Sequence, residues 1–203
     1  VLVSMVRCLL AEDQWKPAEP LLIQIFRYAP DYHRRNWAAA LLTIFYLNER
    51  RLENVYRLVP MLLQPDSFAA RSVALNMAAL QTGDDLFADE KYRDSLWIYR
   101  LVYPHDLLQM NAERQLEILQ KRVEVLTRTP GMIRALLRTQ ESVAEAEAEL
   151  EALKKIPNYD PELFFRIARS YMEIRRYRES SEFFYDLYQD GPKDRAEECL
   201  YLS

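Results

Sequence analysis

The segment PELFFRIARSYMEIRRYRESSEFFYDLYQDGP, from Pro161 to Pro192, decides the fold class of this chain. Apolar residues recur at helical spacing over residues 164–171 and again over residues 177–187, with a short polar stretch between the two runs. This pattern predicts two short helices joined by a tight turn. Because one helix pair of this size cannot bury its apolar side alone, we expect it to stack on further pairs of the same kind.

Large and small side chains alternate along the second predicted helix of this segment. Tyr177, Ser180 and Phe184 place a small residue between two aromatic rings, which lets a neighbouring helix approach closely. Together with the closing Pro192, this pattern of about 34 residues resembles the tetratricopeptide repeat. The resemblance implies an all-α fold, a right-handed superhelical stack of antiparallel helix pairs (a solenoid), and a role as a protein-binding scaffold.

Three earlier helix pairs are predicted from the same template, over residues 2–30, 36–65 and 66–104. The residues that take the place of Tyr177 in these pairs are 37 and 40 positions apart: Trp15, Leu52 and Tyr92. The second pair departs from the pattern in two ways. Val55 replaces the small residue, and Pro60 lies inside the second helix, where proline kinks or shortens a helix.

Residues 106–156 predict a long helical hairpin that interrupts the stack. Asp106 is expected to cap the first arm, and the stretch from Thr127 to Gly131 is expected to form the bend. Apolar residues recur about every 3.5 positions on both arms, as in an antiparallel coiled-coil pair. We therefore expect three helix pairs in residues 1–105, the hairpin in 106–156, and one more pair with the start of a truncated next helix in 157–203.

The composition favours helices over sheets. The chain has only three glycines, Gly83, Gly131 and Gly191, and each is expected where a helix stops. The turn of the third pair is accordingly expected to be long, from Thr82 to Glu90. Leu, Ala, Glu and Arg are abundant and are good helix formers. No apolar stretch has the length that a membrane-spanning helix needs.

The net charge of −4 argues against non-specific nucleic-acid binding, although an RNA-binding helical repeat stays a distant alternative. Residues 106–203 account for this charge, with 15 basic and 19 acidic side chains. Cys8 and Cys199 are expected to be buried thiols, too far apart for a disulfide. Because the chain opens on Val1 and ends as a new helix begins, we expect it to be part of a longer protein, in either the cytoplasm or the periplasm.

The resemblance to tetratricopeptide repeats also implies a binding groove. In that family the first helix of each pair lines a concave surface on which ligands bind. The matching positions here, with Trp37 as an aromatic anchor, are Arg7, Leu10, Trp37, Ile44, Leu47, Met77, Gln81, Phe165, Arg169, Met172 and Glu173. This surface is largely apolar, so either a partner segment covers it, or flanking repeats and the hairpin do.

Two charged features have alternative interpretations. The pairs Arg50-Arg51 and Arg175-Arg176 both stand where a first helix ends, a position at which cations stabilise the helix dipole. They could instead bind an acidic partner or a phosphate. The acidic stretch from Glu141 to Glu151 is interpreted as a solvent-exposed helix face, and the alternative is a binding site for a basic partner.

The sequence predicts no catalytic residue, cofactor or metal site. His33 and His105 have no cysteine or second histidine at metal-ligand spacing, and the chain has no glycine-rich phosphate loop. The leading expectation is a non-catalytic scaffold that binds another protein or peptide segment in the groove. The alternative is a structural or oligomerisation segment of a larger bacterial envelope or secretion protein, self-associating through residues 106–156.

Overall fold

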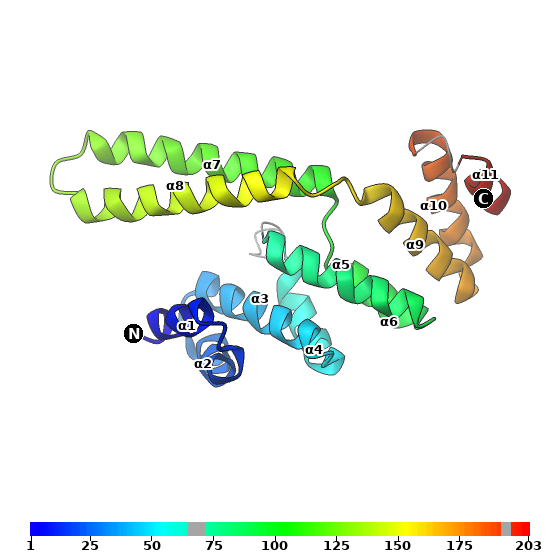
Figure 1. The fold of residues 1–203 in the computed structure, drawn as a ribbon, viewed down its shortest axis with the longest axis horizontal. Helices are drawn as coiled ribbons and strands as arrows, with labels where there is room; N and C mark the ends of the chain where they lie inside the picture. Colours follow the sequence, from blue (N-terminus) through cyan, green and yellow to red (C-terminus); the bar gives the residue numbers. More distant parts are fainter. Residues whose placement is uncertain (65–71, 192–195) are drawn as a thin grey trace. The chain divides into compact units, whose positions relative to one another are not determined.

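The computed structural model describes residues 1–64, 72–191 and 196–203, and every regular element in these ranges is an α-helix (Figure 1). The all-α class predicted from the sequence is therefore confirmed. Pro192 and residues 65–71 lie outside the described ranges. The helices are α1 (Leu2–Ala11), α2 (Trp15–Tyr28), α3 (Tyr32–Asn48), α4 (Leu52–Leu62), α5 (Val73–Ala88), α6 (Tyr92–Tyr99), α7 (His105–Thr127), α8 (Ile133–Lys154), α9 (Asp160–Glu173), α10 (Tyr177–Asp190) and α11 (Ala196–Leu202).

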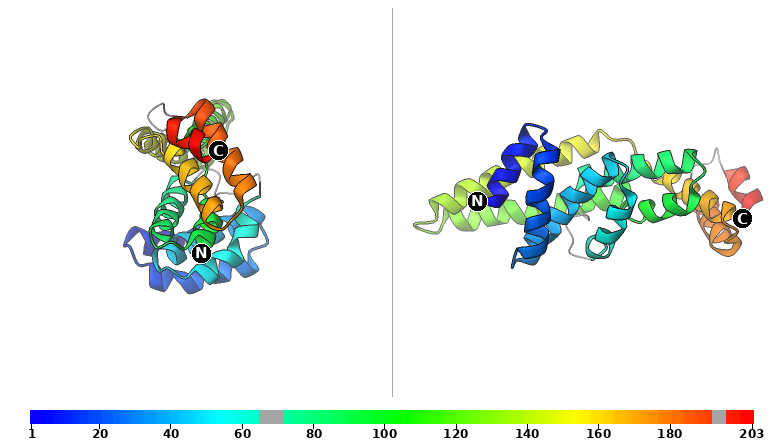
Figure 2. Two further views of the ribbon diagram at one scale, coloured as in Figure 1. Left: turned by 90° about the vertical axis from the view of Figure 1, so that its right-hand side faces the viewer. Right: turned by 90° about the horizontal axis from the view of Figure 1, so that it is seen from below.

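The helices belong to two compact units. The first unit, residues 1–102 and 161–203, contains the helix pairs α1–α2, α3–α4, α5–α6 and α9–α10, together with α11, which packs on α10. The second unit, residues 103–160, contains α7 and α8. Figure 2 shows the helices of each unit from two further directions.

A turn of the same length and conformation joins the two helices of every pair in the first unit. Each turn has three residues, and its middle residue has left-handed backbone geometry with φ between 55° and 64°. The next residue donates its N–H to the carbonyl five positions earlier, at 2.8–2.9 Å, as in the Schellman motif. The left-handed residues are Asp13, Arg50, Glu90 and Arg175.

This shared turn aligns the four pairs residue by residue and identifies two buried positions. Five residues after the left-handed residue, on the second helix, the side chain is at most 2% exposed in every pair: Ala18, Val55, Ser95 and Ser180. Seven residues before it, on the first helix, the residue is buried in every pair: Val6, Thr43, Gly83 and Ala168. In the last pair the two positions meet, because the Ser180 hydroxyl donates to the Ala168 carbonyl at 3.0 Å.

Gly83 lies inside a helix, so the predicted stop there was wrong. Helix α5 continues through Gly83 to Ala88, and the turn is three residues long instead of running from Thr82 to Glu90. The ring of Tyr99 on α6 lies against Gly83, where a Cβ atom would overlap it. Glycine is therefore needed at this position for close packing between helices and not for chain reversal.

Ion pairs connect successive pairs of the first unit. These contacts are Arg51 with Glu19 at 3.2 Å, Arg50 with Asp85 at 2.9 Å, and Arg166 with Asp84. Partly exposed ion pairs contribute only about 0–1 kcal/mol each to stability. We therefore infer that these ion pairs mainly fix how neighbouring helix pairs are oriented. Burial of apolar side chains provides most of the stabilisation.

The hairpin of the second unit is formed by α7 and α8, which run antiparallel and side by side (Figure 1). Gly131 stands in the bend with φ of 81°. Few side chains are buried on either arm: His105 and Leu108 on α7, and Thr139, Leu150 and Leu153 on α8. The facing positions between them are only half-buried, among them Leu116, Leu119, Val123 and Leu126.

The two cysteines have different environments. Cys199 is buried, as expected, but Cys8 is exposed, so the prediction of two buried thiols was wrong for Cys8. Cys8 lies on α1, whose only buried residue is Val6. Within the described ranges, no helix combines the length and the apolar character that crossing a membrane would require.

Candidate interaction surface

The predicted groove residues of α3 are divided between the surface and the core. Trp37 is half-buried, whereas Ile44 and Leu47 are 7% and 1% exposed. Helix α3 packs against α2, α4 and α5, and ten of its 17 residues are buried. Ile44 and Leu47 are therefore core residues in this chain. Of the three groove residues predicted on α3, Trp37 is the one that remains accessible to solvent.

The groove residues predicted on α9 contact their own neighbours. Phe165 and Met172 pack against the buried cluster formed by Ala168, Phe184, Leu187 and Cys199. The ring centroids of Phe165 and Phe184 are 5.6 Å apart in an edge-to-face arrangement. Arg169 and Glu173 form an ion pair at 3.0 Å with each other. Their charges are thus largely satisfied within α9.

The remaining predicted positions are accessible. Arg7 and Gln81 are exposed, and the amide of Gln81 donates to Asp85 at 3.2 Å. Leu10 and Met77 are half-buried, like Trp37. These residues come from the first helices of three successive pairs, α1, α3 and α5, and they form the part of the predicted surface that a partner can reach.

A basic and aromatic cavity, which the sequence did not predict as a site, lies in the first unit. Its volume is about 630 Å³, and its walls come from α6 with its C-cap residue, from the end of α9, and from the turn between α9 and α10. The lining residues are Arg93, Leu96, Trp97, Arg100, Tyr171, Ile174 and Arg176. The spacing of Arg93 and Trp97 on α6 and of Arg100 at its C-cap could have indicated this site, since residues three, four and seven positions apart share a helix face.

Aromatic contacts hold the cavity walls in place. The Trp97 side chain is 47% exposed, and its ring centroid lies 6.1 Å from that of Tyr56 on α4. The Tyr56 hydroxyl donates to Asp94 at 2.9 Å, and burial together with this bond raises the pKa of Tyr56. The Arg100 guanidinium lies 5.0 Å from the Trp97 ring centroid, in cation–π geometry.

The arginines of this cavity differ in their partners. Arg176 stacks on Tyr171 at 5.2 Å and forms an ion pair with Glu179, which raises the pKa of Arg176 through the bond between them. Arg93 and Arg100 pair with no carboxylate of the described residues. Two guanidinium charges at the cavity are therefore uncompensated within the described part of the chain.

Both arginines of the first predicted pair form ion pairs with carboxylates of this chain. Arg50 and Arg51 bind the carboxylates of neighbouring helix pairs, as described above, and the Arg51 guanidinium also stacks on Phe45 at 5.4 Å. Arg175, in the second predicted pair, is the left-handed residue of its turn. Among the four arginines of the two pairs, only Arg176 lines a described cavity.

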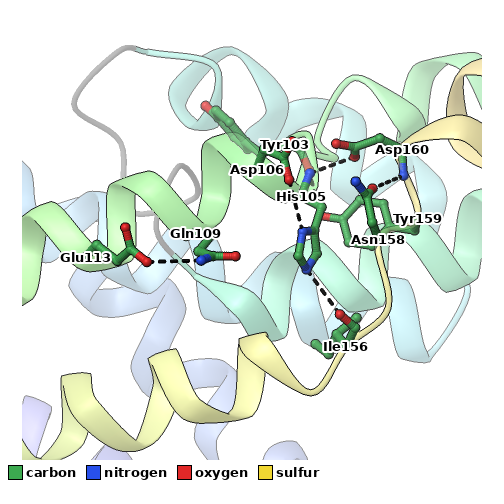
Figure 3. A network of polar contacts seen from close by, with 9 residues as sticks. All are labelled: Tyr103, His105, Asp106, Gln109, Glu113, Ile156, Asn158, Tyr159 and Asp160. Carbon is green, nitrogen blue, oxygen red and sulfur yellow. Dashed lines mark hydrogen bonds and ion pairs between the residues drawn. The ribbon is translucent and has the colours of Figure 1, made fainter. Parts of the chain in front are cut away.

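A polar network closes the base of the hairpin (Figure 3). His105 is 7% exposed, its backbone N–H donates to Asp160 at 2.6 Å, and its ring Nε2 lies 3.1 Å from the Ile156 carbonyl. The Tyr159 hydroxyl donates to the Tyr103 carbonyl at 2.7 Å. These contacts hold the residues before α7 next to the residues that follow α8.

The expected cap at Asp106 was wrong. Helix α7 begins at His105, and no side chain of its own first residues caps it. Instead, the carboxylate of Asp160, 55 positions later in the chain, accepts the N–H of His105. Both His105 ring nitrogens face an acceptor, because Nδ1 lies 3.5 Å from Asp106. This arrangement gives His105 a structural role at the hairpin base.

Comparisons with known proteins identify no relative. No family model matches the sequence, no curated protein matches it, and no solved structure matches its fold. In the described ranges, no group of three or more His, Cys, Asp or Glu side chains is arranged to hold a metal ion. The functional inference therefore depends on the geometry of this chain alone.

Proposed function

We propose that this chain is a non-catalytic scaffold of the tetratricopeptide type, a right-handed superhelical stack of helix pairs that binds a segment of a partner protein in a concave apolar groove. The observation that carries the proposal is the recurrence of one turn and two buried packing positions in four helix pairs. Proteins built from such repeats present a continuous surface formed by equivalent helices, and that surface is suited to extended ligands.

The proposed groove consists of the accessible positions of α1, α3 and α5. Leu10, Trp37 and Met77 would provide apolar contact area, and Arg7 and Gln81 would provide polar contacts at its edge. Trp37 is the proposed anchor because tryptophan buries a large area when a partner covers it, and such residues dominate interface energies. Ile44 and Leu47 would support the groove from below.

The test compares two aromatic substitutions in a binding assay. Proteins retained from source lysate by the immobilised chain are identified, and the main one is purified and titrated by calorimetry. Trp37→Ala should weaken its binding by ~2 kcal/mol, about 30-fold, with little loss of folding. Tyr28→Ala is the matched control, because Tyr28 lies on α2 and is 75% exposed. Unchanged affinity of Trp37→Ala, or a loss of stability with unchanged affinity, would contradict the groove.

A second candidate function is self-association through the hairpin. Large apolar side chains are exposed along both arms and at the bend of the hairpin: Leu107, Met110, Ile118, Val125, Met132, Ile133 and Leu137. Two helices alone bury few of their side chains, whereas two hairpins can combine into a four-helix bundle with a common core. This candidate would make the chain a structural or oligomerisation segment of a larger protein.

Sedimentation velocity separates this candidate from a monomeric scaffold. If the hairpin self-associates, the chain should dimerise as its concentration rises, and the double variant Ile118→Lys with Leu137→Lys should stay monomeric. The control replaces Lys121 and Arg134, which are exposed on the same arms, with glutamine. A wild-type chain that remains monomeric at all concentrations would rule this function out for the chain.

A further inference from the structure

The cavity lined by Arg93, Trp97, Arg100 and Arg176 shares no residue with the proposed groove, and its chemistry points to another ligand. Arg93 on α6 and Arg100, the C-cap residue of α6, both line the cavity, and neither pairs with a carboxylate in the described ranges. Glu179 pairs with Arg176, while the Asp94 carboxylate accepts a hydrogen bond from the neutral Tyr56 hydroxyl and forms no ion pair with Arg93 or Arg100 in the described ranges. Of the three arginines that line the cavity, Arg176 has a carboxylate partner and Arg93 and Arg100 have none in the described ranges, so the lining carries a net positive charge.

Arginine side chains in this arrangement favour oxyanions. The guanidinium group is planar and can donate two parallel hydrogen bonds to one carboxylate. Stacking of Arg100 on Trp97, 5.0 Å from the ring centroid, restricts the guanidinium and lowers the entropy lost on binding. A ligand with carboxylates spaced along a short segment could reach both Arg93 on α6 and Arg100 at its C-cap, seven residues later.

The apolar part of the cavity requires a second feature in the ligand. Trp97 is 47% exposed and is held from behind by Tyr56, while Leu96 and Ile174 contribute aliphatic surface. A half-exposed tryptophan between two arginines matches a ligand that carries an apolar side chain beside its acidic groups. Free inorganic anions would leave this apolar surface uncovered.

We propose that this cavity binds an acidic, extended segment of a partner protein, with carboxylates on Arg93 and Arg100 and an apolar side chain on Trp97. The volume of about 630 Å³ is in the range of ligand pockets, roughly 300–1,000 Å³. It suits a few side chains of an extended segment, whereas a helix is about 10–12 Å wide with its side chains. The acidic stretch of α8 is helical, so a second copy of this chain is the less suitable occupant.

A synthetic peptide provides the direct test. The full chain is titrated by fluorescence anisotropy with a labelled twelve-residue peptide that carries six Asp and Glu residues around a central leucine. The comparison peptide has Asn and Gln in their place. The acidic peptide should bind at low ionic strength at least about tenfold more tightly than the amide peptide, and its affinity should fall as salt rises.

Charge-changing variants locate the binding. Arg93→Glu with Arg100→Glu should reduce affinity for the acidic peptide at least about tenfold, and the milder Arg93→Gln with Arg100→Gln should also reduce it. The control, Arg122→Glu with Arg134→Glu, changes net charge by the same amount on the hairpin, where both residues are exposed, and should retain binding. Circular dichroism establishes that each variant is folded.

Three outcomes would overturn the proposal. Equal binding of the acidic and amide peptides would remove the role of the carboxylates, and unchanged binding by the Arg93 and Arg100 variants would place the peptide elsewhere. A concentration-dependent dimer that the same variants abolish would identify a second copy as the occupant. None of these results depends on Trp37, so the groove of the proposed function would be unaffected by them.

Discussion

The hairpin has longer helices than the first unit, but it buries fewer of their side chains. Helix α3 has 17 residues and buries ten of them, whereas α7 and α8 have 23 and 22 residues and bury two and three. The difference follows from the number of neighbours, since α3 packs against three other helices and each arm of the hairpin packs mainly against the other arm. Helix length alone therefore does not indicate where the stabilising core of this chain lies.

The largest expected effect contrasts a leucine of each region. Leu22 on α2 is fully buried, so Leu22→Ala should lower the free energy of unfolding by ~2–5 kcal/mol. Leu119 on α7 is half-buried, and Leu119→Ala should cost about 1 kcal/mol, since only part of its apolar area leaves water on folding. Urea unfolding followed by circular dichroism measures both, and equal losses would contradict the contrast between the regions.

The next effect tests the close approach of helices within a pair. Ser180 is 2% exposed and donates to the Ala168 carbonyl, so Ser180→Phe should overpack this contact and destabilise the chain by ~1–3 kcal/mol. Ser181, the next residue, is half-buried and bonds within its own helix. Ser181→Phe is the matched control and should cost about 0.5 kcal/mol or less. Thermal stability of Ser180→Phe equal to that of the unchanged chain would mean that the four pairs are misaligned.

A smaller effect concerns the left-handed turn residue. Glu90 has φ of 60°, a conformation that β-branched residues resist and glycine adopts freely. Glu90→Val should destabilise the chain by about 1 kcal/mol, while Glu90→Gly should be neutral or slightly stabilising. Differential scanning calorimetry of the two variants measures the difference. A valine variant as stable as the glycine variant would show that the turn is not constrained in this way.

The smallest expected effect is the contribution of Tyr99 ionisation to stability, which is absent at neutral pH and appears only under alkaline conditions. Burial, together with the bond to Asp84, raises the pKa of Tyr99 above the ordinary tyrosine value of 10.0. The folded chain thus holds this proton more tightly than the unfolded chain, so the associated stability is complete below pH 10 and is lost as pH rises above it. Absorbance at 295 nm should show late-ionising tyrosines, Tyr56 among them, and Tyr99→Phe should reduce the amplitude of this late step by one tyrosine. An unchanged amplitude of the late step in Tyr99→Phe would contradict the assignment.

The sequence predicted those features that depend on local pattern. Helical periodicity located the helix pairs and the hairpin, because side chains three and four positions apart share a helix face. The four left-handed turns have no such signal: Asp13, Arg50, Glu90 and Arg175 include no glycine, the residue that usually marks this conformation. Their equivalence became visible only when the backbone geometry was compared.

Features that depend on distant contacts could not be predicted in this way. Gly83 looked like a helix stop because the ring that requires it, Tyr99, belongs to the next helix. The cap of α7 comes from Asp160, 55 residues away from the amide that it accepts. Of the candidate groove, Ile44 was predicted to be accessible but is buried, since the burial of α3 arises from several packed neighbours.

Hydrogen exchange of the full chain, followed by mass spectrometry at the lowest workable concentration, tests the central contrast most directly. Amides that open locally exchange before those that need global unfolding. If the core of this chain lies in the helix pairs of the first unit, peptides from α7 and α8 should exchange well before those from α3 and α5. Protection in the hairpin equal to or greater than that in α3 and α5 would contradict this account.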